Sequence, residues 1–323
     1  MKISVVMSTY NGEKYITEQL DSIRKQSQNA DEVILYDDAS TDNTINIIQA
    51  YIKKYDLKNW SLYYGQKNKG YISGFTEVLR YATGEIIFLA DQDDIWETNK
   101  IGEIYKLMKK YPNILALNSS FSIVDEYGEK MAGRKVPFSS NNGWMLFKTV
   151  KKGKVASVSE QYILKNNISP GCTMTIRRNL LDDFFAFNDE EKIPHDWKLN
   201  FLAAKRQGCF FWNRPLIKYR IHQTNTIGTE ISQTLTKQYR IHTYEIRLNG
   251  YNAFSEVFLR QKDKFGSEYH LKCERYKKFY SKRISALQNE KIGKIVCVAV
   301  YGLLVVGLEG ITTLMDIGSI IKK

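Results

Sequence analysis

The sequence has little cysteine, proline or glycine, and each shortage excludes a class of protein. Only 4 of its 323 residues are cysteines, and they lie far apart, at Cys172, Cys209, Cys273 and Cys297. This spacing fits neither a disulfide framework nor a zinc site built from close cysteine pairs. The 5 prolines and 20 glycines are too few for a collagen-like or linker-dominated chain. With 43% hydrophobic and 25% charged residues, the composition is that of a globular protein.

The sequence also lacks a hydrophobic run long enough to cross a bilayer as a helix. The longest apolar run, residues 295–308, has 14 residues and ends before Glu309, whereas a spanning helix needs about 20. Lys291 and Lys294 precede the run, which favours a helix lying in a membrane interface, and a helix buried in a dimer explains it equally well. Lys2 is followed by a short apolar run without a cleavage site, so we expect no secretory signal and a cytoplasmic location.

Positive charge is in excess but is unevenly spread. The chain has 47 Lys and Arg against 35 Asp and Glu, a net charge of +12. Residues 237–294 contain 14 basic and 6 acidic residues, so they hold 8 of those 12 charges. Such a segment suits an anionic partner, for example a bilayer surface or a nucleic acid, or it is a solvated helical surface. Because the rest of the chain shows no groove-binding or base-stacking motif, we expect no nucleic-acid partner.

Predicted strands and helices alternate in the first part of the chain. Short apolar runs predict buried strands at residues 3–7, 33–36, 60–64 and 85–90, with segments of helical spacing between them. This alternation predicts βαβ units, and therefore an α/β fold with a mainly parallel sheet flanked by helices. Further strands are expected at residues 114–117, 121–124, 171–176, 210–212 and 216–219. Residues 126–168 have weak periodicity and are expected to form loops that could cover a site, and long basic helices follow after about residue 233.

Polar clusters follow three of the predicted strands directly. They are Thr9-Tyr10-Asn11, Asp37-Asp38 and the stretch from Asp91 to Asp94. Because the carboxyl ends of parallel strands meet at one edge of a sheet, these clusters should converge on one crevice.

The sequence Asp91-Gln92-Asp93-Asp94 is the strongest local signal for chemistry. Three carboxylates in four residues repel one another unless something cationic offsets them. Oxygen ligands favour a hard cation, Mg²⁺ or Mn²⁺, which keeps open positions for substrate phosphates. The alternative is a solvated turn that caps the next helix.

Three further residues are candidates on weaker grounds. Asp38 ends a strand, where a carboxylate can form a turn or accept a hydrogen bond from a base N–H or a ribose hydroxyl. Asp196 stands at a predicted helix start, where the helix stabilises an anion, and it is either a simple cap or a general base. His222 lies in a polar loop and could ligate a metal or contact a diphosphate, although a loop histidine often does neither.

These motifs together resemble glycosyltransferase family 2, whose fold is called GT-A. The resemblance rests on residues 5–12 and 36–42, on the stretch Asp91-Gln92-Asp93-Asp94-Ile95-Trp96, and on three later motifs at residues 171–174, 194–197 and 219–225. The form of the acidic stretch is similar to that of bacterial rhamnosyltransferases that build cell-wall and capsular polysaccharides. The resemblance covers residues 1–228, which it implies are a GT-A domain with a nucleotide-binding half to about 110 and an acceptor-binding half over 111–228. Residues 229–323 match in general character only, as a basic helical region for membrane association or dimerisation.

The resemblance implies a role for each matching position. Residues expected to bind the nucleotide sugar are Thr9, Asn11, Glu13, Asp38, Asp91 and Asp94. Residues expected to hold Mn²⁺ or Mg²⁺ are Asp93, Asp91 and His222. Asp196 is expected to be the catalytic base, and the sugar and acceptor pocket is expected to include Gly171, Cys172 and Trp197.

The implied activity is transfer of a sugar from a nucleotide donor with inversion of configuration. L-rhamnose from dTDP-rhamnose is the first expectation, and a UDP-hexose donor is the alternative. The implied acceptor is a lipid-linked saccharide at the inner face of the plasma membrane, in cell-surface polysaccharide synthesis, and a homodimer is also expected to be possible. Outside the enzymes, the competing reading is a basic scaffold that binds a membrane or a nucleic acid.

Overall fold

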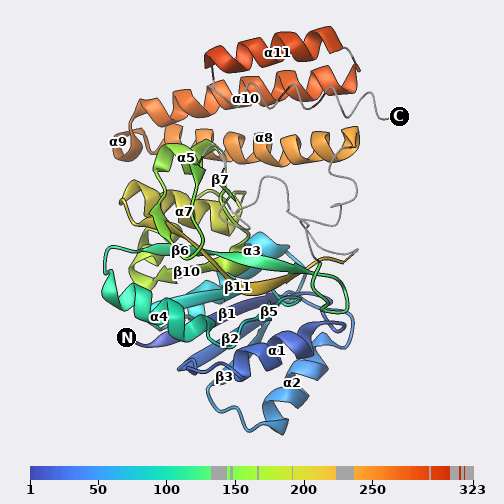
Figure 1. Ribbon diagram of the computed structural model, residues 1–323, viewed down its shortest axis with the longest axis vertical. Helices are drawn as coiled ribbons and strands as arrows, with labels where there is room; N and C mark the ends of the chain where they lie inside the picture. Colours follow the sequence, from blue (N-terminus) through green and yellow to red (C-terminus); the bar gives the residue numbers. More distant parts are fainter. Residues whose placement is uncertain are drawn as a thin grey trace. The chain divides into compact units, whose positions relative to one another are not determined.

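The expected alternation of strands and helices is present in the computed structural model of the chain (Figure 1). The structure describes residues 1–131, 144–145, 148–165, 167–190, 192–222, 236–290, 292–305, 313 and 316. Two compact units share the chain, one formed by Met1–Ala186 with Pro194–Ile227 and the other by Phe187–Ile193 with Gly228–Lys323.

The first unit is built on four parallel strands. They are β1 (Ile3–Thr9), β2 (Glu32–Asp37), β3 (Trp60–Tyr64) and β4 (Ile86–Ala90), in the spatial order β3-β2-β1-β4. All five residues of β4 are buried, which is why its sequence is uniformly apolar rather than alternating. The edge at which these strands end therefore carries the three polar clusters that follow β1, β2 and β4.

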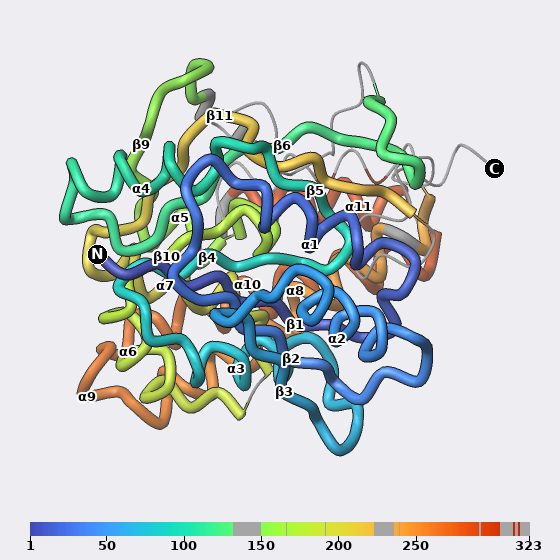
Figure 2. Tube along the Cα trace, turned by 90° about the horizontal axis from the view of Figure 1, so that it is seen from below, coloured from blue at the N-terminus to red at the C-terminus, as the bar shows by residue number. Residues whose placement is uncertain are grey.

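Helices cover both faces of this part of the sheet. The helices α1 (Ile16–Arg24) and α2 (Thr44–Lys54) lie on one side of β1–β3, and α3 (Tyr71–Tyr81) lies on the other (Figure 2). This placement follows from right-handed crossovers, because the strand order reverses between β3 and β4. The point of reversal in an open α/β sheet is where ligands usually bind.

The remaining strands make the sheet mixed rather than parallel throughout. Strand β10 (Met174–Arg177) runs antiparallel between β4 and β6 (Ala116–Val124), and β11 (Cys209–Arg220) runs parallel to β6. The short strands β5 (Ile95–Trp96) and β9 (Val155–Ser157) pair antiparallel with β11. The other elements of this unit are α4 (Lys100–Lys110), β7 (Trp144–Met145), β8 (Lys148–Thr149), α5 (Glu160–Lys165), η2 (Gly171–Thr173), η3 (Arg178–Leu180), α6 (Leu181–Ala186) and α7 (His195–Lys205).

The second unit is helical. It contains α8 (Lys237–Arg260), α9 (Lys262–Phe265), α10 (Ser267–Gln288) and α11 (Ile292–Val305), and α10 packs against both α8 and α11 (Figure 1). None of the helices in the described part of the chain is both long and apolar enough to span a membrane.

Tyrosine and phenylalanine side chains form the interior of this helical unit. The ring of Tyr251 stacks on that of Tyr276 with centroids 4.9 Å apart, and Phe254 stacks on Phe258 at 5.6 Å. These four rings are buried, so they are not available to a membrane surface. The reason is that α8 and α10 pack face to face, and flat rings fill the space between them efficiently.

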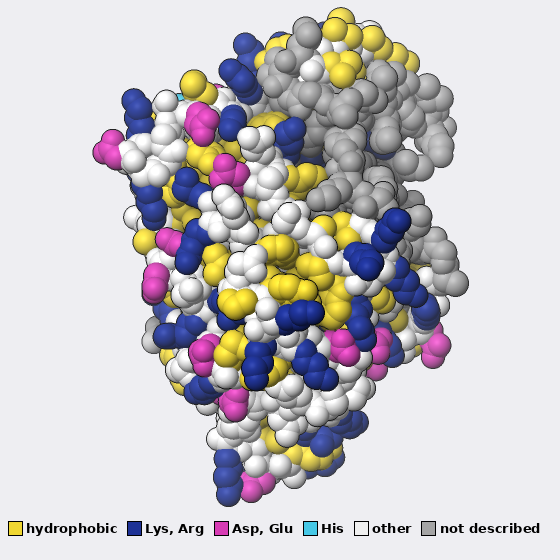
Figure 3. Space-filling view, turned by 60° about the vertical axis from the view of Figure 1, so that its left-hand side comes forward, with side chains coloured by type: hydrophobic (Ala, Val, Ile, Leu, Met, Phe, Trp, Pro, Cys, Tyr) yellow, Lys and Arg dark blue, Asp and Glu magenta, His cyan; other side chains and the backbone are white. Residues whose placement is uncertain are grey.

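The basic residues of the same unit are partly internal too. The guanidinium groups of Arg240 and Arg283 are buried and bind the carboxylate of Asp316 at 3.0 Å and 2.7 Å. On the face of the molecule in Figure 3, Lys and Arg side chains are interspersed with Asp, Glu and hydrophobic ones. The count of positive charges in the sequence therefore overstates the charge available to a partner.

Candidate active site

The strand ends of the first unit meet as the sequence predicts. Thr9 and Asp37 are paired in the register of β1 and β2, and the Thr9 hydroxyl donates to Asp37 Oδ2 at 2.7 Å. The amide N–H of Asp38 donates to the carbonyl of Thr9 at 2.8 Å. These bonds lock the ends of the two strands together and fix the start of the loops that follow.

The side chains of Asn11 and Glu13 connect those two loops. Asn11 Oδ1 accepts from the amide of Thr41 at 2.8 Å, and Glu13 Oε2 accepts from the amide of Asn43 at 2.9 Å. The backbone of Asn11 is left-handed, with φ 47°, a conformation that asparagine tolerates better than most residues. In this structure both side chains shape the crevice wall, and their contact with a nucleotide stays a prediction.

Asp38 is buried and holds the turn that leads into α3. Its Oδ2 accepts from the amides of Lys69 at 2.9 Å and Gly70 at 2.8 Å. Gly70 has φ +85°, a conformation that glycine adopts without strain. The other oxygen, Oδ1, accepts a longer bond from the amide of Lys69 at 3.1 Å, and its contact with a pyrimidine stays a prediction.

The acidic turn after β4, residues 91–94, is clamped to the loop after β1. Gln92 Oε1 accepts from the amide of Tyr10, and Gln92 Nε2 donates to the carbonyl of Tyr10, both at 2.9 Å. A Cβ on Gly12 would lie 2.3 Å from Gln92 Oε1, so only glycine leaves room for the clamp. The Gln19 side chain donates to the carbonyl of Asp91 at 2.8 Å and anchors the turn to α1.

Arg220, at the end of β11, anchors the far side of the acidic turn. Its guanidinium is 1% exposed and donates from Nε to the carbonyl of Asp93 at 2.8 Å and from Nη1 to that of Glu126 at 2.9 Å. It also pairs with Glu18, and its amide donates to Asp94 Oδ1 at 3.1 Å. The single side chain thus ties the turn to α1 and to the loop after β6.

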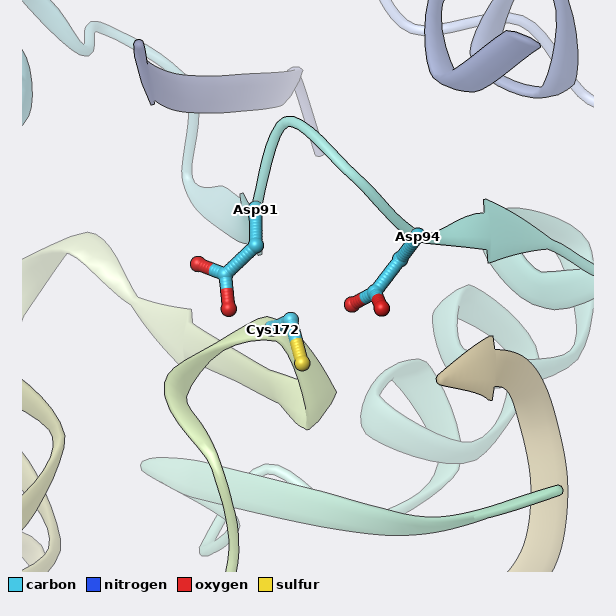
Figure 4. Close-up of side chains that lie close together, drawn as sticks. All are labelled: Asp91, Asp94 and Cys172. Atoms are coloured by element: carbon cyan, nitrogen blue, oxygen red, sulfur yellow. The ribbon is translucent and has the colours of Figure 1, made fainter. Parts of the chain in front are cut away.

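Asp91, Asp94 and Cys172 point toward one another (Figure 4). One ligand atom from each lies within 4.8 Å of the others. Burial, with the charge of Asp93, raises the pKa of Asp91 to about 7 and that of Asp94 well above its ordinary value. Burial also raises the pKa of the Cys172 thiol, which stays protonated and is a poor ligand for a metal.

Lys100 brings a positive charge to the same place from the start of α4. Its ammonium donates to the carbonyl of Cys172 at 3.0 Å and lies 3.6 Å from the ring centre of Trp96. Burial lowers the pKa of Lys100 to about 7, although the acids of the turn oppose this shift. From the sequence alone, a lysine at the start of a helix is expected to be solvated. The structure shows that Lys100 is buried.

Asp93 and His222 form a pair beside this buried cluster. His222 Nε2 lies 2.8 Å from Asp93 Oδ2, and the imidazole lies against Tyr15 with ring centroids 4.5 Å apart. Both side chains retain some exposure, 17% for Asp93 and 7% for His222. The carboxylate of Asp93 is a ligand type that suits Mn²⁺ or Mg²⁺. Among the described residues, however, Asp91 groups with Asp94 and Cys172 rather than with the expected partners Asp93 and His222.

Asp196 is buried in the first turn of α7. Its Oδ1 accepts from the amide of Trp197 at 2.7 Å, and its Oδ2 accepts from Asn167 Nδ2 at 2.8 Å. Burial raises the pKa of Asp196 to about 6 against the effect of these bonds, so the group is mostly a carboxylate at neutral pH and can accept a proton. The charge of Asp196 also raises the pKa of Asp91, so the two carboxylates are close enough to interact electrostatically.

The comparison with known proteins now identifies the family. Residues 4–185, more than half of the chain, match the family model described as glycosyl transferase family 2. The chain belongs to this family. The predicted family and fold class are therefore confirmed, since solved structures with the same fold are also glycosyltransferases.

Individual relatives of this family 2 glycosyltransferase differ in the sugar that their names state. It is 30% identical over 240 residues to the dTDP-rhamnosyl transferase RfbG of Shigella flexneri, covering 70% of this chain and 75% of that one. It is 42% identical over 97 residues to the poly(ribitol-phosphate) beta-N-acetylglucosaminyltransferase TarS of Staphylococcus aureus, covering 29% and 16% of the two chains.

Two solved structures share the fold at lower identity. S. aureus TarS 1–349 in complex with UDP matches with a TM-score of 0.56 at 19% identity, covering 99% of this chain and 89% of that one. The mannosyltransferase PcManGT from Pyrobaculum calidifontis, in complex with GDP-Man and Mn²⁺, matches with a TM-score of 0.56 at 18% identity, covering 99% and 85%.

Gly171 and Trp197, two of the predicted pocket residues of the glycosyltransferase, lie in packed surroundings. A Cβ on Gly171 would lie 2.5 Å from Nε2 of His195, whose ring stacks on Phe75 at 3.9 Å and has no room to move. Gly171 therefore lets α7 begin close to η2, which sets the position of Asp196. The indole of Trp197 is buried and donates to the carbonyl of Ile163 at 2.7 Å, so in this structure it fastens α7 to α5.

Proposed function

We propose that this chain is an inverting, metal-dependent rhamnosyltransferase. It moves L-rhamnose from dTDP-rhamnose to a hydroxyl of a lipid-linked saccharide in the synthesis of a cell-surface polysaccharide. The similarity to a dTDP-rhamnosyl transferase over 240 residues supports the choice of donor. The observation that carries the reaction type is the buried carboxylate of Asp196 in the first turn of α7, with Oδ2 held by Asn167 Nδ2 at 2.8 Å and the pKa raised by burial to about 6.

Asp196 acts as the base in this proposal. Its carboxylate accepts the proton of the acceptor hydroxyl while the hydroxyl oxygen bonds to the anomeric carbon of the sugar. The bond from that carbon to the diphosphate oxygen breaks at the same time, and its electron pair leaves with the nucleoside diphosphate. Attack on the face opposite the leaving group inverts the configuration in one displacement, as in inverting glycoside hydrolysis.

Asp93, His222 and Asp91 would hold the divalent cation. When bound, Mn²⁺ or Mg²⁺ supplies positive charge that stabilises the leaving diphosphate. The protein residues do the remaining work on the donor side. Arg220 keeps the acidic turn in place through the carbonyl of Asp93, and Gln92 keeps it aligned with the loop after β1.

The nucleotide is proposed to lie against the ends of β1 and β2. Asp38 Oδ1 would accept from the N3–H of the pyrimidine, while Thr9, Asn11 and Glu13 form the adjoining wall. Asp94 would face the donor from the acidic turn. Thymine and uracil both present this N3–H, so the contact selects a pyrimidine without choosing between the two.

A UDP-hexose donor, such as UDP-N-acetylglucosamine, is the second candidate. It is favoured by the 42% identity over 97 residues to an N-acetylglucosaminyltransferase. A basic scaffold without activity is disfavoured, because a scaffold has no need of a buried Asp196 beside a crowded acidic turn.

A donor screen by thermal unfolding tests the proposal. We expect dTDP-rhamnose with Mn²⁺ to raise the Tm of the protein, since a ligand at a hundred times its Kd stabilises the folded state by about 2.7 kcal/mol. The shift should vanish in Asp93→Ala and persist in Asp182→Ala, which changes an exposed aspartate on α6. If only a UDP-sugar raises the Tm, dTDP-rhamnose is not the donor. If no nucleotide raises the Tm, the basic scaffold becomes the favoured function.

The helical unit is proposed to attach the enzyme to an anionic bilayer on the cytoplasmic side. Helix α11 exposes one apolar stripe, with Val296 42%, Val300 55% and Leu303 45% accessible. Lys294 on the same helix is exposed, and Lys282 of α10 lies 5.0 Å from the ring centre of Tyr301 on α11. Apolar side chains bordered by lysines are typical of a helix that lies in a membrane interface.

Sedimentation with vesicles tests this attachment. The protein should sediment with phosphatidylglycerol vesicles, and Val300→Asp should weaken this severalfold while Leu271→Asp, at an exposed leucine of α10, changes it little. If Val300→Asp instead converts a dimer to a monomer and leaves sedimentation intact, the stripe is a contact between two copies of the chain.

A further inference from the structure

Two buried asparagines and one half-buried asparagine form a continuous chain of hydrogen bonds that ends on Asp196. Asn118 Nδ2 donates to Asn200 Oδ1 at 2.7 Å, and Asn200 Nδ2 donates to Asn167 Oδ1 at 3.0 Å. Asn167 Nδ2 then donates to Asp196 Oδ2 at 2.8 Å. The members come from β6, α7 and the segment before η2, so the chain crosses three separate parts of the first unit.

The direction of this chain is fixed by its surroundings. Asn167 Oδ1 also accepts from the amide of Ile168 at 3.0 Å, so the side-chain amide of Asn167 must present its NH₂ group to Asp196. Asn200 Oδ1 accepts from the thiol of Cys209 at 3.4 Å, which orients Asn200 in the same way. Asn200 Nδ2 also donates back to Asn118 Oδ1 at 3.3 Å, so Asn118 and Asn200 bind each other in both directions, while Asn200 and Asn167 each donate one bond toward Asp196.

Placing these amides in the interior is costly for the fold. Asn118 and Asn200 are both fully buried, at positions where the neighbours Leu117 and Phe201 are apolar. An amide taken out of water without full compensation costs stability, so apolar side chains of similar volume would serve packing at least as well. The hydrogen-bond chain is better explained by a need to orient the carboxylate of Asp196 and to keep it charged.

We propose that Asn118, Asn200 and Asn167 are positioning residues for Asp196. Their hydrogen bonds hold Oδ2 of Asp196. This orients the carboxylate toward the acceptor hydroxyl and stabilises its charged form. The inference rests on the role of Asp196 in the proposed function, and it adds three residues that no local sequence pattern indicates.

The chain should also set the pH dependence of transfer. A hydrogen bond to the charged form favours it, so the amide of Asn167 lowers the pKa of Asp196 against the effect of burial. Asp91 and Tyr71 face Asp196 from the acidic turn and from α3, and both stay in place when Asn167 is changed. His195 and Lys198 lie beside it on α7, and burial lowers the pKa of His195 to about 3, so it stays neutral.

The test is the pH profile of kcat/KM for the full chain and for Asn167→Ala. We expect the acid limb of the profile to move up by about one pH unit, as loss of one hydrogen bond to a charged group predicts. The KM for the donor should stay unchanged, because Asn167 acts on the acceptor side. Asn200→Ala should move the limb in the same direction by less, and Asn179→Ala, at an exposed asparagine, should not move it.

The outcomes separate this inference from the proposed function. If Asn167→Ala lowers kcat or Tm but leaves the acid limb where it is, the asparagines are structural only and the inference is wrong. If Asp196→Asn remains active, the proposed base is wrong whatever the asparagines do. Should Asn200→Ala fail to fold, Asn167→Ala still decides, since Asn167 lies at the less buried end of the chain.

Discussion

Replacing Asp196 by asparagine is expected to slow sugar transfer by about 10²–10⁴-fold, the usual contribution of a general base. Asparagine keeps the shape of the side chain but cannot accept the proton. Donor affinity should change little if Asp196 is the proposed base, because a base acts on the acceptor hydroxyl. A transfer assay combined with calorimetric titration of the donor measures both quantities. In the unchanged protein, kcat/KM should fall as the pH drops through about 6, where burial places the pKa of Asp196 and the base becomes protonated.

The matched control is Asp182→Asn, at an exposed aspartate of α6. It changes the net charge by the same amount and should leave transfer intact. Near-normal turnover in Asp196→Asn would remove this residue from the role of base. Loss of donor binding together with turnover would show that the substitution disturbs the whole crevice.

Replacing Arg220 by alanine is expected to destabilise the first unit by about 2–6 kcal/mol, because the carbonyls of Asp93 and Glu126 each lose a hydrogen-bond donor at a cost of about 1–3 kcal/mol. Glu18 is 51% exposed and stays hydrated, so the lost ion pair adds little. The guanidinium is 1% exposed and satisfies the carbonyls of Asp93 and Glu126 as well as the carboxylate of Glu18. All of these acceptors would lose their donor. Thermal unfolding should show a Tm lower by roughly 10 °C for a unit of this size.

Arg214→Ala provides the comparison on the same strand. Arg214 pairs with Glu103 at 3.0 Å, but both side chains are about one third exposed, at 39% and 30%. Such a surface pair contributes about 1 kcal/mol or less. Equal shifts in Tm for the two variants would mean that Arg220 does not anchor the acidic turn.

The first half of the fold could be predicted because its signals are local. Strands expected at residues 60–64 and 85–90 are found at Trp60–Tyr64 and Ile86–Ala90. A strand buried on both faces must be apolar along its whole length, and this is visible without knowledge of its neighbours.

The middle of the chain was harder, because its elements depend on distant partners. Residues 126–168 were expected to be loops, yet their described part contains β9 and α5. Strand β9 is three residues long and exists through pairing with Phe210–Trp212 of β11. Strand β11 was expected as two strands separated by Asn213–Pro215, but shifts of register near Pro215 carry one strand through that stretch.

The residues of the candidate site also fall into two groups, those that the sequence indicates locally and those that only the fold brings together. The acidic turn and Asp196 stand out locally, as carboxylates directly after a strand and at a helix start. The asparagines that hold Asp196 lie 82, 33 and 29 positions from their partners, and no pattern in the sequence connects them.

The acidic turn also determines how the ligands of the crevice affect one another. A nucleoside diphosphate would bring its own negative charges to a space that already contains Asp91, Asp93 and Asp94. Nucleotide and divalent cation should therefore bind with positive cooperativity, each raising the affinity of the other by the same factor. By the same linkage, the product nucleoside diphosphate should dissociate readily once its cation has left. The repulsion among the carboxylates, which destabilises the empty enzyme, would then speed product release.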